Sequence, residues 1–278
     1  MTTHRYHEID VFTATALRGN PLAVVHDATG LDDAALQAFA RWTNFSETSF
    51  LLPPSDPQAD YRVRIFTPDR ELPFAGHPTL GSCHAWLAAG GTPKAAGEVV
   101  QQCGVGLVRV RRSGTRLAFA APPLRRGGEV DAATRADIAR SLRIGPDTIR
   151  AAQWVDNGPG WVAVLLGSRD EVLALQPDFA ALRPSDIGVV APCPPGHEAQ
   201  FEVRAFIAGV GPSEDPVTGS LNASLGQWLI GAGLAPERYV AAQGTALGRA
   251  GRVHVERIDG QVWVGGDCVE VVAGLVHL

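Results

Sequence analysis

The sequence lacks any uninterrupted apolar run that approaches the roughly 20 residues of a membrane-spanning helix. We also expect no secretion signal, since no apolar segment follows a basic start in the first seven residues. Only 4 cysteines are scattered through 278 residues, and no two form a C-x-x-C pair. Scattered cysteines predict free thiols and a cytoplasmic location. The lack of a long apolar run predicts that the protein has no membrane partner.

Charge is also scarce. Charged residues make up 19% of the chain, and 24 Lys and Arg against 29 Asp and Glu give a net charge of −5. The basic residues form no long run, which argues against a nucleic-acid partner. Hydrophobic residues make up 45%, which is enough for a buried core and excludes wholesale disorder.

The motifs of several enzyme classes are absent. The segment Gly104-Val105-Gly106 lacks the third glycine of a dinucleotide fingerprint, and no G-x-x-x-x-G-K-[ST] loop occurs. There is no G-x-S-x-G of a serine hydrolase, no H-E-x-x-H and no paired-cysteine spacing. We therefore expect neither a nucleotide cofactor nor a metal ion.

What the sequence does contain is an internal repeat. Residues 61–91 and 201–233 both open with V-R-x-F, pass through a loop rich in Pro and Gly, and end in an apolar stretch. Within them, H-P-T-L-G-S from His77 and D-P-V-T-G-S from Asp215 align at an offset of 138 (215 − 77). Residues 19–25 and 158–164 give a second match, offset by 139 (158 − 19). We interpret two mixed α/β halves, each of ordinary domain size.

Each half is expected to place strands around one buried helix. The expected strands include residues 6–12, 21–25, 48–52 and 61–66, and the expected surface helices are residues 32–42 and 131–142. Residues 79–89 and 219–230 are apolar nearly all round, which predicts a central helix in each half.

The predicted domains are residues 1–125, carrying Glu47 and His77, and residues 126–278, carrying Asp215 and Ser220. Residues 125–128 are the expected linker, and the last strand, near residues 269–272, is compatible with either half.

The repeat places His77 and Asp215 at equivalent points, each just before a central helix. If the halves pack about a pseudo-twofold axis, both helix N-termini point into one cleft, where their N–H groups favour an anion such as a substrate carboxylate. Gly76 and Gly219 allow close approach to the backbone. A histidine or aspartate before proline is also an ordinary turn or cap residue, so both interpretations stay open.

Glu47 is the third candidate, in the segment T-N-F-S-E-T-S-F. It lies between a predicted helix end and an apolar strand, next to Phe45 and Phe50. Partial desolvation there would favour the protonated carboxyl that a general acid needs. A solvated loop glutamate is the alternative.

These motifs resemble a known family. N-x-S-E-T-x-F from Asn44, F-A-G-H-P-T-L-G from Phe74 and E-D-P-V-T-G-S from Glu214 occur in the order and spacing of the phenazine-biosynthesis (PhzF) isomerase family. D-V-F-T from Asp10 and G-N-P-L-A-V-V from Gly19 also fit, so the resemblance covers essentially the whole chain.

The resemblance implies a diaminopimelate epimerase-like α+β fold. It has two pseudosymmetric domains, each a mixed β-sheet curled around a central α-helix, with the site between them. It also implies a homodimer and a cofactor-independent isomerase. The family's best-known reaction isomerises a dihydro-hydroxyanthranilate by shifting a double bond.

Carried over by residue, the resemblance makes Glu47 the acid/base that moves a proton between carbons of a small cyclic or unsaturated carboxylate. His77 and Asp215 would orient the substrate and assist. The backbone groups of Gly76, Gly219 and Ser220, with that of His77, would hold the carboxylate. The chain departs from the commonest family pattern at residues 157–160 and 207–209. We expect these differences to change the wall of the substrate pocket and hence the substrate, but not the fold.

Two other functions remain open. A racemase with one thiol per half is excluded, because residues 76–78 and 214–216 contain no cysteine. An amino-acid epimerase or racemase that uses His77 and Asp215 as non-thiol bases remains an alternative. A substrate-binding or interaction protein that keeps the fold without catalysis is the other.

Overall fold

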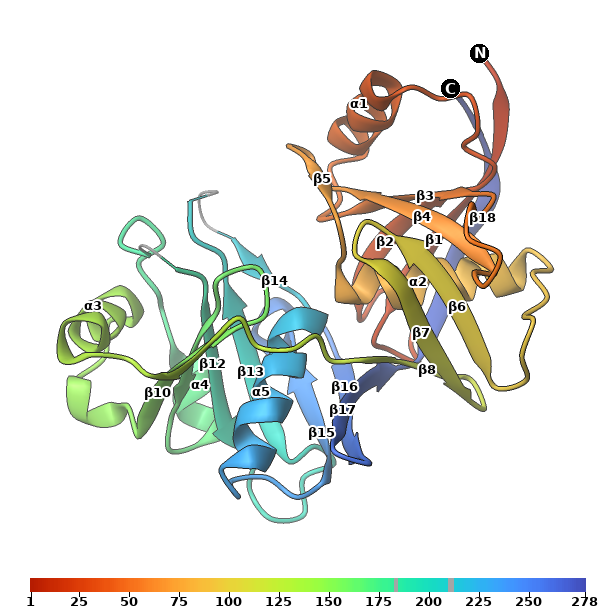
Figure 1. The fold of residues 1–278 in the computed structure, drawn as a ribbon. Helices are drawn as coiled ribbons and strands as arrows, with labels where there is room; N and C mark the ends of the chain where they lie inside the picture. Colours follow the sequence, from red (N-terminus) through yellow and green to blue (C-terminus); the bar gives the residue numbers. More distant parts are fainter. Residues whose placement is uncertain (183–184, 210–212) are drawn as a thin grey trace. The chain divides into compact units, whose positions relative to one another are not determined.

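The computed structural model describes residues 1–182, 185–209 and 213–278, and these divide into two compact units (Figure 1). Unit 1 comprises residues 1–120 together with 265–278, and unit 2 comprises residues 121–264. The boundary therefore lies five residues before the expected one, and the end of the chain belongs to unit 1. Across the described residues, no helix combines the length and the apolar character that a bilayer crossing needs.

Unit 1 is a mixed sheet with two helices. Its strands are β1 (Thr3–Val11), β2 (Asn20–Val25), β3 (Thr48–Leu52), β4 (Tyr61–Phe66), β5 (Glu71–Leu72), β6 (Glu98–Cys103), β7 (Gly106–Ser113), β8 (Arg116–Ala120) and β18 (Cys268–His277). Its helices are α1 (Asp33–Thr43) and α2 (Gly76–Ala88). The strand order β18–β1–β2–β3–β4–β6–β7–β8 is parallel at β2–β3 and β4–β6 and antiparallel at the other junctions.

Unit 2 has the same design. Its strands are β9 (Arg126–Glu129), β10 (Ala151–Asp156), β11 (Val162–Leu165), β12 (Ile187–Pro192), β13 (Phe201–Phe206), β14 (Glu214–Asp215), β15 (Arg238–Gln243), β16 (Gly251–Ile258) and β17 (Gln261–Gly266). Its helices are α3 (Ala132–Leu142), α4 (Arg169–Ala174) and α5 (Gly219–Gly231), with short 3-10 turns at Pro146–Thr148 and Thr245–Leu247.

The order β9–β10–β11–β12–β13–β15–β16 repeats the pattern of unit 1 junction by junction, with parallel pairs at β11–β12 and β13–β15. The two-residue strands β5 and β14 each pair antiparallel with β4 and β13. The predicted pseudosymmetric α+β fold is thus confirmed at the level of strand pairing. The predicted linker at residues 125–128 is wrong, because Arg126–Glu129 forms β9, which pairs with β10.

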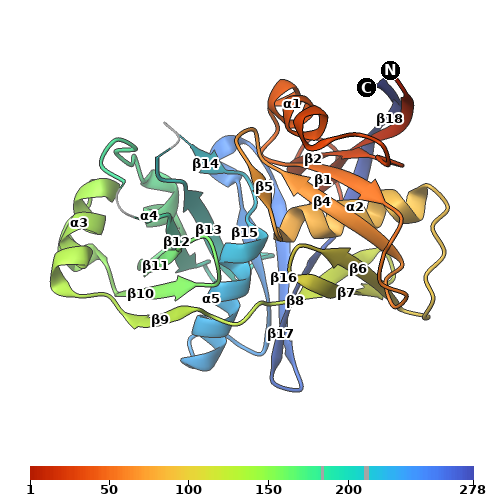
Figure 2. The ribbon, with the colours of Figure 1, turned by 45° about the horizontal axis from the view of Figure 1, so that its top comes forward.

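The two central helices are confirmed as well. Helix α2 contacts β1, β2, β3, β6, β7, β8 and β18, and it lies among the strands of unit 1 in Figure 2. Helix α5 contacts β10 and β16. Both helices are buried over most of their residues because their sequences are apolar on every side. Helix α2 begins at Gly76 rather than at residue 79, since proline at position 78 is tolerated in a first turn.

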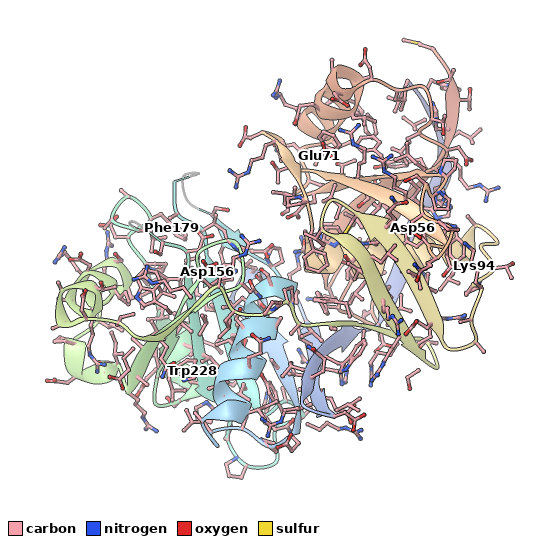
Figure 3. All side chains as sticks on the ribbon, viewed as in Figure 1. Asp56, Glu71, Lys94, Asp156, Phe179 and Trp228 are labelled. Atoms are coloured by element: carbon pink, nitrogen blue, oxygen red, sulfur yellow. The ribbon has the colours of Figure 1, made fainter. Side chains whose placement is uncertain are left out.

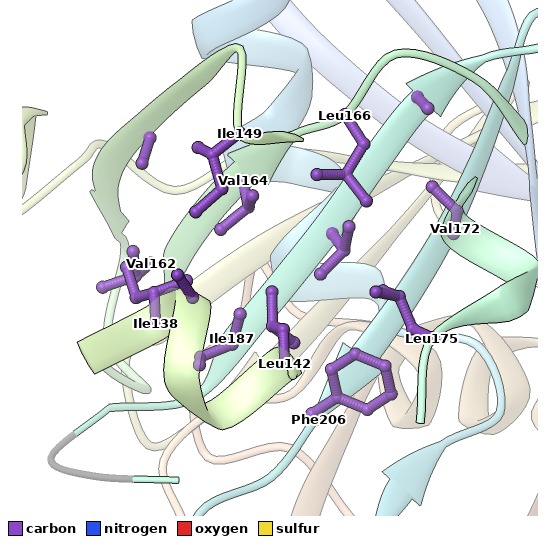
Figure 4. Close-up of a cluster of buried hydrophobic side chains, with 14 of the residues drawn as sticks. Ile138, Leu142, Ile149, Val162, Val164, Leu166, Val172, Leu175, Ile187 and Phe206 are labelled. Carbon is purple, nitrogen blue, oxygen red and sulfur yellow. The ribbon is translucent and has the colours of Figure 1, made fainter. Parts of the chain in front are cut away.

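The surface helices bury one face each. Asp32 caps α1, and Leu36, Phe39 and Ala40 are its buried residues, as the spacing predicts. In unit 2, α3 lays Ile138 and Leu142 into a cluster of aliphatic side chains from β11 and β12 (Figure 4). Each helix thereby packs its apolar face against strands of its own unit.

Candidate active site

The two central helices begin without a side-chain cap. Helices α1, α3 and α4 are capped by the side chains of Asp32, Asp131 and Ser168, which accept from first-turn N–H groups. Neither Ala75 before α2 nor Thr218 before α5 makes such a bond. The first turn of an α-helix has N–H groups with no partner inside the helix, and its positive end favours an anion. In each unit, this helix start is therefore suited to bind a carboxylate.

His77 lies in the first turn of α2 and is buried. Its Nδ1 atom lies 3.5 Å from Nδ2 of Asn20, the first residue of β2, and the ring is hydrogen-bonded to the backbone of Pro21. Burial lowers the pKa of His77 to about 3, although the bond to Pro21 acts in the opposite direction. The ring is therefore neutral near pH 7.

Glu47 ends the loop that joins α1 to β3. Helix α1 stops at Asn44, which adopts the left-handed conformation with φ 57°, and the hydroxyls of Thr43 and Thr48 approach to 3.1 Å across the loop. The following strand is anchored by Phe50, which is fully buried in a cluster with Phe39. The loop is thereby pinned at both ends, and the Glu47 side chain is only 16% exposed.

The structure brings Glu47 and His77 together. Oε2 of Glu47 lies 3.5 Å from Nε2 of His77, at the start of α2. Because the ring is neutral, this contact is not an ion pair. A carboxyl beside a neutral imidazole and an uncapped helix start can exchange a proton with a bound acid while the helix holds the acid's carboxylate.

The corresponding residue of unit 2 is Ser220, not Asp215. The central helices start at residues 76 and 219, an offset of 143, so His77 matches Ser220 in the first turn. Asp215 lies in β14, four residues before α5, and matches Leu72 of β5. The predicted equivalence of His77 and Asp215 is wrong because the H-P dipeptide lies inside its helix, whereas the D-P dipeptide precedes its helix.

Ser220 is held by the loop after β10. Trp161, which is almost fully buried, donates from Nε1 to Oγ of Ser220 at 3.1 Å. Nδ2 of Asn157 donates to the Ser220 carbonyl at 2.9 Å. The loop itself is fixed by Asp156, labelled in Figure 3, whose Oδ1 accepts from the backbone of Gly158 and Gly160. This segment is one of the two where the chain departs from the commonest family pattern.

Asp215 is held by the residues that follow it. Oδ2 of Asp215 accepts from the Thr218 hydroxyl at 2.6 Å, and its carbonyl accepts from the Gln243 side chain at 3.1 Å. Gly219 then starts α5 and is buried. In unit 1, Glu47 thus lies beside the first turn of α2, which contains Gly76 and His77. In unit 2, Asp215 lies four residues before α5, whose first turn contains Gly219 and Ser220.

Sequence reasoning missed Asn20, Trp161 and Gln243 as partners of these residues. Asn20 lies in the G-N-P-L motif, which pointed to the segment but not to His77. In the matching strand of unit 1, Gln101 lies two residues before the position that corresponds to Gln243, so the sequence contained no direct signal for Gln243. In the described part of the chain, no group of His, Cys, Asp or Glu side chains is arranged to hold a metal ion.

Comparison with known proteins assigns the family. The pattern of the family described as "Phenazine biosynthesis-like protein" (PhzC-PhzF) matches residues 9–274, nearly the whole chain. The chain belongs to this family. On that membership, and because its relatives carry the name isomerase, it is an enzyme of the isomerase class.

Three curated relatives illustrate the range of names. "Antisense-enhancing sequence 1" of Schizosaccharomyces pombe is 35% identical, with 99% of each chain covered. An "uncharacterized isomerase" of Mesorhizobium japonicum is 35% identical over 100% of both chains. "Trans-2,3-dihydro-3-hydroxyanthranilate isomerase" of Pseudomonas fluorescens is 35% identical, covering 78% of this chain and 76% of the relative.

Solved structures agree on the fold. A PhzF-family protein of Enterococcus faecalis superimposes with a TM-score of 0.83 at 25% identity, covering 100% of both chains. A hydroxyproline epimerase of Agrobacterium vitis gives a TM-score of 0.60 at 13% identity, covering 99% of this chain and 92% of the epimerase. The second likeness concerns the fold alone, and together they confirm the two-domain, epimerase-like architecture.

Proposed function

We propose that this isomerase moves a proton between two carbons of a small cyclic or unsaturated carboxylate, so that a double bond shifts, without a metal or organic cofactor. One C–H bond beside a double bond breaks, the electron pair moves along the chain of carbons, and a new C–H bond forms. No electrons enter or leave, and the proton that is removed is the proton returned. A single acid/base group is therefore sufficient. The activity in the name of the P. fluorescens relative supports this reaction class.

Glu47 is the proposed proton carrier. The observation that carries this assignment is the contact of its largely buried carboxyl with the neutral imidazole of His77, at 3.5 Å. The ring donates to the Pro21 carbonyl, so its Nε2 atom has a lone pair that can accept from the protonated carboxyl. Because the ring is uncharged, it does not hold the carboxyl in its ionised form, and Glu47 can act first as base and then as acid. Low exposure also limits exchange of the carried proton with water.

The remaining residues bind and orient the substrate. In this proposal the first-turn backbone groups of Gly76, His77, Gly219 and Ser220 hold the substrate carboxylate. The side chains of His77 and Asp215 orient the reacting carbons and assist the transfer. Each of these residues lies at or just before an uncapped helix start.

The test compares wild type with Glu47→Gln on trans-2,3-dihydro-3-hydroxyanthranilate in deuterated water. Wild type is expected to shift the double bond, followed by NMR. The variant should keep its melting temperature and bind the compound, but turn over about 10²- to 10⁴-fold more slowly. Unchanged turnover in the variant would overturn the role of Glu47.

The same assay separates the alternatives. Deuterium exchange at one carbon, with the double bond in place, would favour an epimerase that uses non-thiol bases. Tight binding with neither a double-bond shift nor deuterium exchange, over a panel of unsaturated and cyclic carboxylates, would favour a protein that binds such compounds without catalysis.

A further inference from the structure

Gln243, the last residue of β15, is fully buried and makes four hydrogen bonds. Its Nε2 atom donates to the Asp215 carbonyl at 3.1 Å and to Oγ1 of Thr218 at 2.9 Å. Its Oε1 atom accepts from the backbone N of Thr218 at 3.0 Å and from Nδ2 of Asn222 at 2.8 Å. Both of its N–H groups and two oxygen lone pairs are used, so this amide has no freedom to rotate.

Two backbone groups determine which atom of the Gln243 side-chain amide is the nitrogen and which is the oxygen. The N–H of Thr218 can only donate, and the carbonyl of Asp215 can only accept. A rotated amide would set donor against donor at Thr218 and acceptor against acceptor at Asp215. The Nε2 atom of Gln243 must therefore be the atom that faces the Thr218 hydroxyl.

The direction of the next bond follows. A threonine hydroxyl has a single proton, and here its oxygen already accepts from Gln243. The proton is directed to Oδ2 of Asp215, 2.6 Å away, a length typical of a hydroxyl donating to a carboxylate. Gln243 therefore donates to the Thr218 hydroxyl, and that hydroxyl donates to Oδ2 of Asp215, which is fixed as the acceptor. We call these two bonds the chain of donors.

This use of Thr218 replaces its ordinary role. Thr218 is the N-cap residue of α5, where a threonine oxygen usually accepts from a first-turn N–H and stabilises the helix. It makes no such bond. Turning the hydroxyl toward Asp215 leaves the first-turn N–H groups of α5 without a side-chain cap.

Unit 1 also contains a buried glutamine–threonine pair, but at other positions of the strand and the helix: Thr79 lies within α2, whereas Thr218 precedes α5. Gln101 of β6 is fully buried, and its Nε2 atom donates to Oγ1 of Thr79 at 3.2 Å. Its Oε1 atom accepts from the Tyr61 hydroxyl at 2.9 Å. Thr79 donates to the backbone carbonyl of Ala75 at 2.9 Å. In unit 1 the threonine of the pair thus bonds to a backbone carbonyl, whereas in unit 2 it bonds to a carboxyl group.

We propose that Gln243 is a positioning residue of the isomerase: acting through Thr218, it holds Asp215 in one rotamer with Oδ2 fixed as a hydrogen-bond acceptor. The proposal rests on the proposed function, because it takes Asp215 as a residue that assists the proton transfer.

Three variants change the chain of donors with little change of shape. Thr218→Val removes the hydroxyl, Thr218→Ser restores it, and Gln243→Glu puts an acceptor where Nε2 donates. On trans-2,3-dihydro-3-hydroxyanthranilate, Thr218→Val and Gln243→Glu should lower kcat about tenfold to hundredfold, with little change in KM. KM is expected to hold because the helix N–H groups stay in place. Thr218→Ser should recover most of kcat.

Thr79→Val is the matched control. It removes one acceptor of the Gln101 amide, as Thr218→Val removes one of the two acceptors of the Gln243 amide, and it should lower the melting temperature by a similar amount while kcat stays near wild type. An equal loss of kcat in Thr79→Val, or normal kcat in Thr218→Val, would overturn the proposal.

A crystal structure of Thr218→Val decides the positioning role without any turnover. We expect the Asp215 side chain to leave its rotamer while α5 still begins at Gly219. An unchanged rotamer would overturn the proposal. Inactivity of the wild-type enzyme on the compound would count against the proposed function alone, since the rotamer comparison would still decide the role of Gln243.

Discussion

Nε2 of His77 lies 3.5 Å from Oε2 of Glu47, and the histidine in this contact carries no charge near neutral pH. Burial lowers the pKa of His77 to about 3, so the pair is a carboxyl beside a neutral ring. A charged ring would hold the carboxyl in its ionised form, whereas a neutral ring accommodates both forms. The burial of His77 therefore fits the proposed role of Glu47 as proton carrier.

His77→Gln should lower kcat about tenfold to hundredfold, because the variant loses the buried ring that lies 3.5 Å from the Glu47 carboxyl. The loss is expected to be the same at pH 5 and pH 8, since a ring with a pKa of about 3 does not titrate between them. Steady-state rates of both proteins across this range provide the measurement. A kcat ratio that changes with a midpoint near the ordinary histidine value would show that the ring is protonated in the working enzyme.

The stability of unit 1 should fall as the solution becomes acidic. Burial, with a smaller contribution from the neighbouring His7, lowers the pKa of His26 to about 4, and the two rings lie 4.8 Å apart. In the unfolded chain a histidine has a pKa of about 6.5. Between these values the unfolded chain binds a proton that the folded chain does not, so the free energy of unfolding decreases as pH falls through this window.

His26→Phe keeps a ring against His7 and removes the titrating group, so its urea midpoint should depend less on pH between 7 and 4. The exposed His277 offers a control, and His277→Gln is expected to leave the wild-type slope unchanged. An identical slope in His26→Phe and wild type would show that His26 does not contribute to the acid sensitivity.

The repeat made the fold predictable. Two apolar stretches, each preceded by V-R-x-F and a glycine-rich loop, were enough to predict the buried helices α2 and α5 and the mixed sheets around them. Periodicity also gave the buried face of α1, because Leu36, Phe39 and Ala40 follow helical spacing.

Other features carry no local signal. Strand β18 pairs with β1 from the opposite end of the chain, so its place in unit 1 depends on tertiary pairing alone. The motif alignment gave the wrong partner for His77, because the segment before α5 is longer than the segment before α2. Gln243 reaches Asp215 only because β15 runs parallel to β13, which sequence spacing does not specify.

Close packing of α2 predicts a strong effect at Gly81. A Cβ atom there would lie 2.5 Å from Cδ2 of Leu22 and 2.9 Å from Cγ2 of Val11, in the buried centre of unit 1. Gly81→Ala should therefore lower the free energy of unfolding by about 1–3 kcal/mol. Gly231, the exposed last residue of α5, has nothing within 4 Å of such an atom, and Gly231→Ala should instead stabilise by about 0.5–1 kcal/mol. Urea unfolding of the two variants measures both values, and equal effects would contradict this account of the packing.

Arg204 and Glu214 form a buried ion pair that fastens β14, and hence the segment before Asp215. Nε and Nη2 of Arg204 contact the two carboxyl oxygens of Glu214 at 2.9 and 2.8 Å, and each side chain is 7% exposed. Arg204 also donates to the carbonyls of Val172 and Leu175 at the end of α4. Arg204→Leu would leave a buried carboxylate without its partner, so we expect a loss of about 3–5 kcal/mol in the free energy of unfolding.

The repeat again supplies the control. Arg64 and Glu71 form the corresponding pair in unit 1, but their side chains are 19% and 41% exposed, so Arg64→Leu should cost about 1 kcal/mol or less. The double variant Arg204→Leu with Glu214→Leu should be more stable than Arg204→Leu alone, because it removes the unpaired charge. Urea unfolding of all three variants gives these values. If the double variant were no more stable than the single one, the cost would lie in the lost bonds to α4 rather than in the buried charge of Glu214.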